Sequence, residues 1–210
     1  MTDRHAAAEV PPEAARARIR ALEAFVNELT GRLDEARRTL DERNRIDALT
    51  GLANRRAAME WLEESWDEDR TGASPLSVLL VGVDGLSLVN EAFGYRAGDR
   101  ALACIGRVLR HTVRTDDLAG RLAGDQFVLV LPNTPLDGAV QAGWKVSDAV
   151  SEEFVELDGG FWQASVSIGA ATRREGLSTP SALVAAAARS LTEAKRRGHG
   201  LVVPAEPAPA

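Results

Sequence analysis

The first part of the chain carries its apolar residues at heptad spacing. No proline interrupts the segment from Glu13 to Ile46, whose composition favours a helix. Apolar residues recur there in alternating steps of three and four, which is the a/d pattern of a coiled coil. They are Ile19, Leu22, Val26, Leu29, Leu33, Ala36 and Leu40. We expect a helix over residues 13–46 that either pairs in a homodimer or packs on its own domain.

After residue 46 the pattern alternates between short apolar runs and helical periods. Strands are predicted at 77–83, 118–122, 126–131, 162–172 and 201–203. Helices are predicted at 55–66, 86–93, 97–113, 136–154 and 180–197, with Asn54 placed to cap the first. The element order β-α-α-β-β-α-β-α-β indicates an α+β fold in which helices flank a central mixed β-sheet.

The segments on either side of this domain, which spans residues 47–203, differ from it in composition. Residues 1–12 are polar and end in Pro11-Pro12, and residues 204–210 consist largely of proline and alanine. Neither segment offers enough apolar side chains to form a core, so we expect both to be disordered.

Composition narrows the classes of function. The 210 residues are 45% hydrophobic, which suits one domain with an extension. A net charge of −6 provides no basic surface for nucleic acid. The single cysteine, Cys104, excludes an internal disulfide and a CxxC metal site. The chain opens without a signal-peptide pattern, and no apolar run approaches the roughly 20 residues of a membrane span. We therefore expect a cytoplasmic protein.

The turn between the predicted strands at 118–122 and 126–131 carries the most specific motif. It reads Ala123-Gly124-Asp125-Gln126-Phe127, and five residues separate it from Arg114-Thr115-Asp116-Asp117. This pattern resembles the signature of the GGDEF family, the diguanylate cyclases that join two GTP molecules into cyclic di-GMP. The loop is a degenerate copy, with AGDQF in place of GGDEF.

Other segments extend the resemblance over roughly residues 47–203, in the family's order and spacing. Residues 47–56 are similar to DxLTGLxNRR, 82–91 to DxDxFKxxND, 94–99 to GHxxGD, 165–169 to TVSIG and 194–198 to AKxxG. The resemblance implies a nucleotide-cyclase-like fold with a ferredoxin-like palm. It also implies a bacterial protein of signal transduction, in which the N-terminal helix transmits a signal.

The resemblance also identifies what the catalytic centre lacks. In the family, the first aspartate of DxDxFK and an acid of the GGDEF loop hold the Mg²⁺ or Mn²⁺ on which phosphoryl transfer depends. Gly82 and Gln126 stand at acidic positions here. Ser87 replaces a lysine and His199 an arginine on the phosphate side. We therefore expect an inactive enzyme that requires Mg²⁺ or Mn²⁺ only if it is catalytic after all.

Some polar residues at this centre remain. Asp125 is the remnant of the catalytic loop and a candidate metal ligand, with Asp84 as a second candidate. For Asp84, Glu91 and His199 the favoured interpretation is that they are solvated polar residues. Asn90 and Asp99 match the family's guanine-contacting positions and Lys195 a phosphate-contacting one, which leaves weak GTP binding without turnover open. Asn90 and Asp99 are alternatively capping residues.

Arg114 and Asp117 match the RxxD motif that forms an inhibitory cyclic di-GMP site in the family. The planar fork of arginine suits guanine or phosphate, because it donates two parallel hydrogen bonds. Asp117 can accept from the donor edge of guanine, and Arg121 lies close enough in sequence to assist. The alternative is an ion pair between Arg114 and Asp117 at the end of a helix.

Three functions follow from these residues. The first is a degenerate GGDEF protein that binds cyclic di-GMP at Arg114 and Asp117 and relays this to an unknown protein partner. The second is a weakly active diguanylate cyclase that works as a dimer on two GTP molecules. The third is a pure protein-interaction module.

Overall fold

The computed structural model describes residues 18–32, 45–68, 74–157, 159–173 and 177–205. The chain forms two units, Met1–Asn44 and Arg45–Ala210. In the first unit residues 18–32 are helical. Ile19, Leu22, Val26 and Leu29 are each about half exposed on this helix, as is Phe25, which the heptad pattern did not include. The predicted seam residues Leu33, Ala36 and Leu40, and the predicted disordered segment 1–12, lie outside the described residues.

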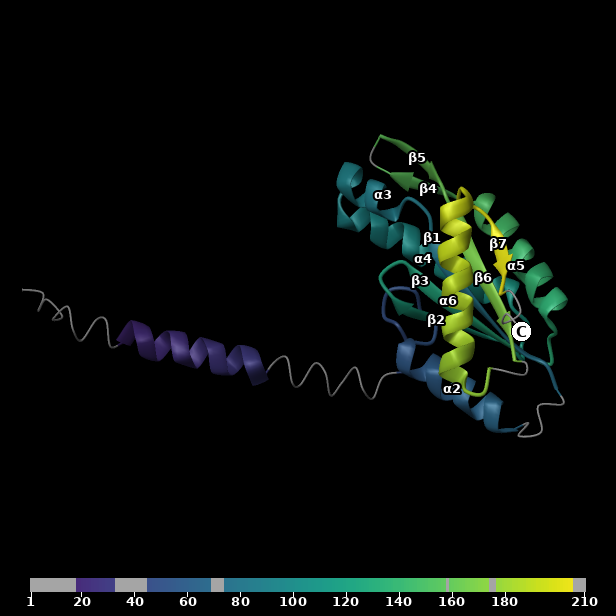
Figure 1. Cartoon of the computed structure of the whole chain (residues 1–210). Helices are drawn as coiled ribbons and strands as arrows, with labels where there is room; N and C mark the ends of the chain where they lie inside the picture. Colours follow the sequence, from purple (N-terminus) through teal and green to yellow (C-terminus); the bar gives the residue numbers. More distant parts are fainter. Residues whose placement is uncertain (1–17, 33–44, 69–73, 158, 174–176, 206–210) are drawn as a thin grey trace, which may run out of the picture. The chain divides into compact units, whose positions relative to one another are not determined.

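The second unit is built on a five-stranded sheet of order β2-β3-β1-β6-β7 (Figure 1). The strands are β1 (Leu76–Val83), β2 (Leu118–Ala123), β3 (Gln126–Pro132), β6 (Val166–Thr172) and β7 (Val202–Pro204). Neighbouring strands run antiparallel except β6 and β7, which are parallel. Every residue of β1 is buried, because helices cover both faces of the sheet.

Two hydrophobic cores flank this sheet. Successive side chains of a strand point to opposite faces, so Leu79 packs in one core and its neighbours Val78 and Leu80 in the other. Helices α2 (Arg55–Glu68) and α6 (Pro180–Arg197) cover the face of Val78 and Leu80. Helices α4 (Tyr95–Thr112) and α5 (Leu136–Ser151) cover the other face, and α3 (Leu86–Phe93) packs on α4.

Gly169 sets the distance between α6 and the sheet. A Cβ atom at this position would collide with the backbone of α6 at Ala187 and Leu191. The glycine therefore allows the helix to lie directly on β6. This close approach carries the last turn of α6, which includes Lys195, to the end of β1.

The structure departs from the sequence prediction between residues 151 and 166. The helix predicted to Phe154 ends at Ser151, and β4 (Phe154–Leu157) pairs with β5 (Gly160–Gln163) in a separate two-stranded sheet. The strand predicted at 162–172 is therefore two strands, β5 and β6. The reason lies in β4, where exposed and buried side chains alternate over only four residues, too few for a period to stand out from the preceding helix.

Contacts at the two ends of the domain test two further sequence predictions. The capping role of Asn54 is confirmed, because its Oδ1 accepts from the backbone N–H of Ala57 at 2.9 Å. The predicted disordered tail is wrong at its first two residues. Pro204 belongs to β7, and the N–H of Ala205 donates to the carbonyl of Ala170 at 2.7 Å. Within the part of the chain that the structure describes, no helix is both long enough and apolar enough to cross a membrane.

Candidate functional site

The AGDQF turn joins β2 to β3 at one end of the sheet. Ala123 is the last residue of β2, Gln126 is the first of β3, and Gly124 between them has a φ of 51°, which glycine adopts without strain. Across the ladder between β1 and β3, Gly82 lies directly opposite Gln126. The two positions that lack an expected acid therefore face each other.

Lys195 fills the space beside these two positions. Its Nζ lies 3.0 Å from Oδ2 of Asp125, in an ion pair whose side chains are 32% and 38% exposed. A Cβ atom added to Gly82 would stand 2.8 Å from Cε and 2.9 Å from Nζ of Lys195. An aspartate at position 82 would thus have to displace the lysine, whereas the glycine leaves room for the lysine to reach Asp125.

Asp84, just after β1, is a buried carboxylate with an exposed fraction of only 8%. Its oxygens accept from the hydroxyls of Ser165 and Ser167 and from the backbone N–H of Gly200, at 2.8–3.1 Å. Nδ1 of His199 lies 3.0 Å from Oδ1 of Asp84. The expectation of a solvated Asp84 is therefore wrong. Both oxygens are engaged within the protein, so Asp84 is a structural anchor for His199, and its role as a metal ligand stays a prediction.

The residues at this end of the sheet do not fit a divalent cation. Mg²⁺ prefers carboxylate and phosphate oxygens, but Gly82 has no side chain and Gln126 offers only a neutral amide. Asp125 is already paired with the Lys195 ammonium. Among the residues that the structure describes, no three His, Cys, Asp or Glu side chains are grouped so as to hold a metal ion.

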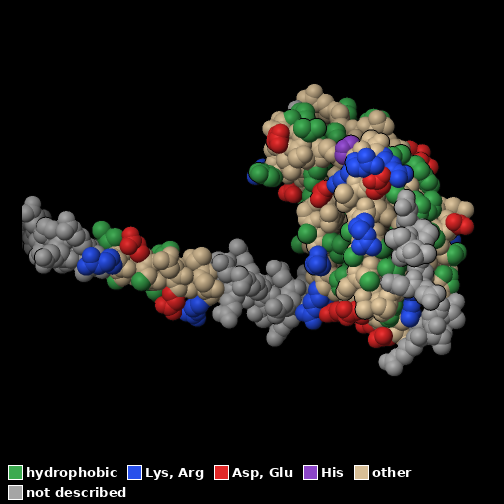
Figure 2. Space-filling model, viewed as in Figure 1, with side chains coloured by type: hydrophobic (Ala, Val, Ile, Leu, Met, Phe, Trp, Pro, Cys, Tyr) green, Lys and Arg blue, Asp and Glu red, His purple; other side chains and the backbone are tan. Residues whose placement is uncertain are grey.

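A cleft of about 560 Å³ opens beside this ion pair. Asn90 and Asp99 line it together with Asp125, Lys195 and His199, so the structure brings together the guanine and phosphate candidates. Neither Asn90 nor Asp99 makes a side-chain capping hydrogen bond with any described residue. The N-cap position of α4 is occupied by a glycine, Gly94. The capping alternative is therefore not supported. Figure 2 shows basic side chains gathered over the C-terminal end of α6, with a histidine at their edge.

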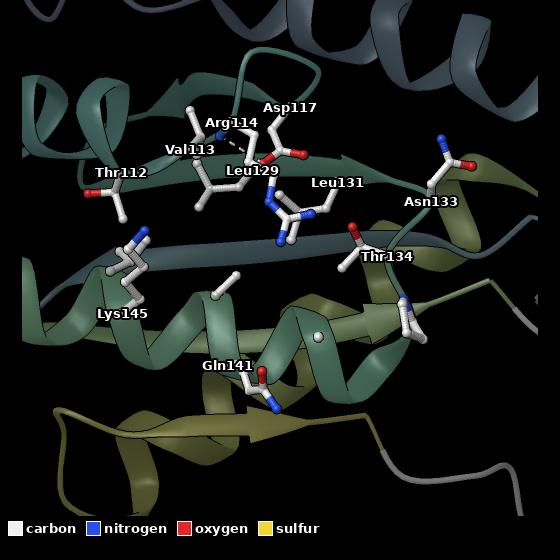
Figure 3. Close-up of a pocket in the computed structure, with 14 residues that line it drawn as sticks. Thr112, Val113, Arg114, Asp117, Leu129, Leu131, Asn133, Thr134, Gln141 and Lys145 are labelled. Atoms are coloured by element: carbon white, nitrogen blue, oxygen red, sulfur yellow. Dashed lines mark hydrogen bonds between the residues drawn. The ribbon is translucent and has the colours of Figure 1, made fainter.

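A second cavity, of about 290 Å³, lies between β3, α5 and the turn after α4. Arg114 and Asp117 line it, and so does Lys145 from α5. Figure 3 shows the guanidinium of Arg114 extending from the turn toward α5. Lys145 carries no motif in the sequence, so only the fold reveals that a second cation faces this cavity.

Arg114 and Asp117 are joined through the backbone of Arg114. Asp117 Oδ2 accepts from the backbone N–H of Arg114 at 3.0 Å, and the N–H of Asp117 donates to the carbonyl of Arg114 at 3.1 Å. These two bonds close a turn in which the guanidinium makes no recorded hydrogen bond or ion pair with any described residue. The alternative of an ion pair between the two side chains is therefore not found.

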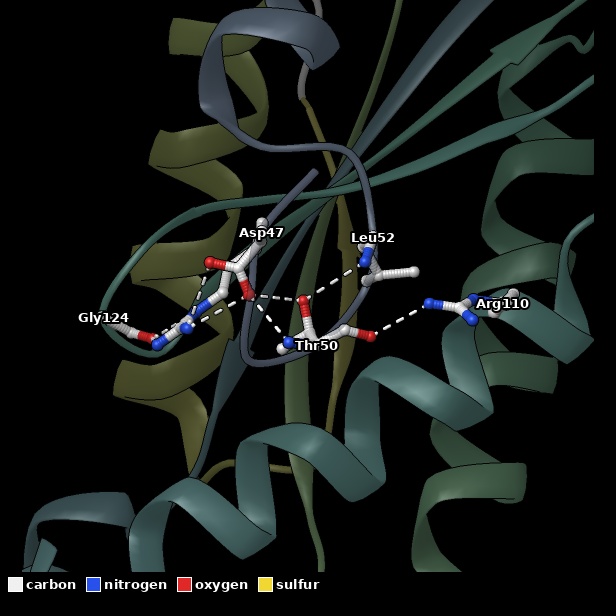
Figure 4. Close-up of polar contacts among 6 residues, drawn as sticks. Asp47, Thr50, Leu52, Arg110 and Gly124 are labelled. Atoms are coloured by element: carbon white, nitrogen blue, oxygen red, sulfur yellow. Dashed lines mark hydrogen bonds and ion pairs between the residues drawn. The ribbon is translucent and has the colours of Figure 1, made fainter. Parts of the chain in front are cut away.

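Arg121 does not join the predicted inhibitory site, and that expectation is wrong. Its guanidinium donates to the carbonyl of Gly124 at 2.9 and 3.2 Å and to the carboxylate of Asp47 at 3.3 and 3.4 Å (Figure 4). The side chain is only 14% exposed. Arg121 therefore ties the AGDQF turn to the segment that opens the domain.

Asp47 is the centre of this polar network. Burial raises its pKa, but hydrogen bonds from the hydroxyl and backbone N–H of Thr50 and the charge of Arg121 outweigh burial, so the pKa of Asp47 is lowered overall. The carbonyl of Thr50 in turn accepts from Arg110 of α4 at 3.0 Å. Sequence reasoning placed Asp47 in a family motif without seeing that its partner is Arg121.

Comparison with known proteins agrees with this arrangement. The sequence model described as "Diguanylate cyclase, GGDEF domain" matches residues 44–200. The chain belongs to the GGDEF family. This GGDEF chain is 34% identical over 160 residues to the response regulator PleD of Caulobacter vibrioides, an alignment that covers 75% of the chain and 35% of PleD. It therefore spans about a third of the length of this curated relative.

Solved structures confirm the α+β, nucleotide-cyclase-like fold of the GGDEF chain. It superposes with a TM-score of 0.73 on the diguanylate cyclase SiaD of Pseudomonas aeruginosa, solved in complex with its activator SiaC. That match has 31% identity and covers 92% of this chain and 75% of SiaD. The GGDEF domain of DgcB from Caulobacter crescentus, solved in complex with cyclic di-GMP, gives a TM-score of 0.73 at 23% identity, covering 78% of this chain and 94% of that one.

Proposed function

We propose that this GGDEF protein binds cyclic di-GMP without synthesising it and relays the bound state to a protein partner. The observation that carries this proposal is the guanidinium of Arg114, which lines a cavity and has no recorded partner among the described residues. Asp117 fixes the backbone from which it extends. A guanidinium held in this way can donate two parallel hydrogen bonds to O6 and N7 of guanine or to a phosphate.

The other polar groups of this cavity complement the same ligand. Asp117 can accept from the N1 and N2 donors of guanine, and the ammonium of Lys145 on the opposite wall can pair with a phosphate. At about 290 Å³ the cavity lies just below the range of roughly 300–1,000 Å³ that is usual for ligand sites. It therefore suits one base or phosphate, with the remainder of cyclic di-GMP lying outside.

The residues at the other end of the sheet, around the AGDQF turn, support the proposal that the protein does not synthesise cyclic di-GMP. Attack of a 3′-hydroxyl on an α-phosphate builds negative charge on phosphate oxygens, which a divalent cation normally offsets. Gly82 and Gln126 offer no carboxylate to hold such a cation, and Asp125 is paired with Lys195. A weakly active cyclase dimer, dependent on Mg²⁺ or Mn²⁺, is the alternative that residual turnover would favour.

The cleft beside Lys195 supports GTP as a second ligand, bound without turnover. Asn90 and Asp99 line one part of the cleft and Lys195 another, which provides a guanine end and a phosphate end in one space. Gly98, which also lines the cleft, leaves room for the Asn90 amide, because a Cβ there would collide with it.

Two observations support the proposal of a protein partner. The relative SiaD was solved with a protein activator, and the apolar side chains on the helix over residues 18–32 are exposed. A homodimer through this helix, or a different protein on it, would each cover these side chains.

Calorimetric titration with cyclic di-GMP, paired with chromatography of a GTP incubation, tests the proposal. We expect cyclic di-GMP to bind and GTP to remain unconverted. Conversion of GTP would favour the cyclase alternative. If the titration shows no binding of cyclic di-GMP and the incubation shows no conversion of GTP, the interaction module is the function that is left.

A further inference from the structure

The cleft beside Lys195 already contains a cation, and it belongs to the protein. The Lys195 ammonium stands 2.9 Å from the point where the Cβ of a residue at position 82 would lie. It also contacts Asp125, the carboxylate that survives from the family's metal-binding loop. The positive charge is thus located where the resemblance places a divalent ion.

We propose that Lys195 replaces the divalent cation in this cleft. The Lys195 ammonium binds the phosphates of a guanosine di- or triphosphate directly, and this binding does not depend on Mg²⁺. This inference rests on the second ligand proposed above, GTP in the cleft, and adds how its phosphates are neutralised.

The chemistry of the ammonium suits this role. A lysine ammonium has three N–H donors, of which one is directed to Asp125 and the other two make no recorded hydrogen bond with described residues. Hydrogen bonds from a charged donor to phosphate are roughly twice as strong as neutral ones. A divalent cation at the same place would be repelled by the ammonium and would meet only one carboxylate.

The other charged groups of the cleft do not repel phosphate at the end where Lys195 lies. The charge of Asp84 is offset by three donors and by contact with His199. The ring of His199 is directed by that contact, and its other nitrogen has no recorded partner among the described residues. Asp99 lines the cleft with Asn90 at the guanine end.

The first test is calorimetric titration of the full chain with GTP, once in EDTA and once in excess Mg²⁺. We expect dissociation constants that agree within about threefold, whereas a metal-bridged site would bind far more tightly with Mg²⁺. Binding at least tenfold tighter with Mg²⁺ would overturn the inference while leaving GTP as a ligand. Absence of binding in both buffers would overturn both.

A pair of variants on α6 provides the second test, in EDTA. Lys195→Gln keeps much of the side-chain volume and removes the charge, so it should weaken GTP binding roughly tenfold to a hundredfold. Arg189→Ala removes a charge from an exposed position of the same helix outside the cleft. It should bind like the parent. Equal binding by Lys195→Gln and the parent would overturn the inference.

The third test needs no nucleotide. Titration of Mn²⁺, followed by electron paramagnetic resonance, should give the same weak binding for the parent and for Asp125→Ala, since Asp125 is held by Lys195. Mn²⁺ binding that Asp125→Ala abolishes would show a metal site in the parent and would overturn the inference. Gly82→Asp combined with Gln126→Glu should gain Mn²⁺ binding, which confirms that the assay detects a site here.

Discussion

The carboxylate of Asp117 accepts a hydrogen bond from the backbone N–H of Arg114, not from its guanidinium. The same carboxylate therefore fixes the turn while leaving the charged end of Arg114 available to a ligand. This separation of roles matters because an internal ion pair would have to be broken before a ligand could bind. It also predicts that substitutions of Arg114 and Asp117 weaken ligand binding for different reasons.

Arg114→Ala should weaken binding of cyclic di-GMP roughly tenfold to a hundredfold. Each charge-assisted guanine contact contributes on the order of 1–3 kcal/mol, and 1.4 kcal/mol is about a factor of ten. Arg114→Lys should fail as well, because an ammonium makes no fork contact. Calorimetry is the measurement, and Arg189→Ala is the control for loss of one positive charge. Parent-like binding by Arg114→Ala would refute the proposed site.

Asp117→Ala should lose at least as much affinity as Arg114→Ala, because it removes both a guanine acceptor and the bond that closes the turn. Asp116→Ala is the matched control, since its exposed neighbouring carboxylate does not line the cavity. Asp125→Ala should also bind cyclic di-GMP normally, because Asp125 belongs to the other end of the sheet. Equal losses from Asp116→Ala and Asp117→Ala would mean that only the general charge of the loop matters.

The parent protein should make no measurable cyclic di-GMP from GTP with Mg²⁺ or Mn²⁺. Removal of one group that stabilises charge in a transition state commonly costs roughly 10²–10³ in kcat, and two acids are missing here. Gly82→Asp with Gln126→Glu places carboxylates on facing positions of β1 and β3 and should restore part of the activity. Ser87 and His199 would still limit it. Robust synthesis by the parent that Asp125→Ala abolishes would establish an active cyclase.

Much of this fold was predictable because its elements are long or strongly periodic. The order of the main strands and helices was correct, and the cap at Asn54 followed from the chemistry of one side chain. The hairpin of β4 and β5 was missed, although Asp158-Gly159-Gly160 is a turn signal, because each strand has only four residues.

The site was predictable as a set of positions but not as a set of contacts. Spacing located Asp125 and Lys195 in family motifs and Arg121 between two of them. It gave no indication that Lys195 would reach Asp125, 70 residues away, or that Arg121 would turn to Asp47, 74 residues away. Such pairings depend on which space the fold leaves open, such as the space above Gly82, and a one-dimensional pattern does not contain that information.

The helix over residues 18–32 should mediate a weak, concentration-dependent dimer. Val26→Glu would place a charge in the apolar seam and should weaken the dimer about tenfold or more, since burial of one such side chain contributes ~1.5–3 kcal/mol. Ala24→Glu adds the same charge off the seam and is the control. Sedimentation equilibrium measures both. A monomer at all concentrations, with or without nucleotide, would refute the dimer.

Deletion is a coarser version of the same test and should end at Asn44. Arg45 and Ile46 belong to the domain, because the carbonyl of Arg45 accepts from the N–H of Asn54 and Ile46 bridges to Ala53. Removal of residues 1–44 should abolish the dimer while cyclic di-GMP still binds. Loss of binding together with the dimer would place part of the ligand site in the N-terminal unit.

The pairing of Asp47 with Arg121 should make the stability of the domain sensitive to acid. The pKa of Asp47 is lowered in the folded state, so its contribution is fully present above the unfolded value, ~3.9, and is lost as pH falls through the folded value. Asp47→Asn removes the charge and leaves Arg121 without its carboxylate, which should cost about 1–3 kcal/mol in free energy of unfolding at pH 7.

Urea denaturation at pH 7 and in steps from pH 5 to about 3 measures both effects. The difference between parent and Asp47→Asn should shrink toward the acid end. Asp67→Asn, at an exposed position of α2 without a recorded partner among the described residues, should stay within about 0.5 kcal/mol of the parent. A difference between parent and Asp47→Asn that persists unchanged at the lowest pH would mean that the carboxylate charge does not stabilise this junction.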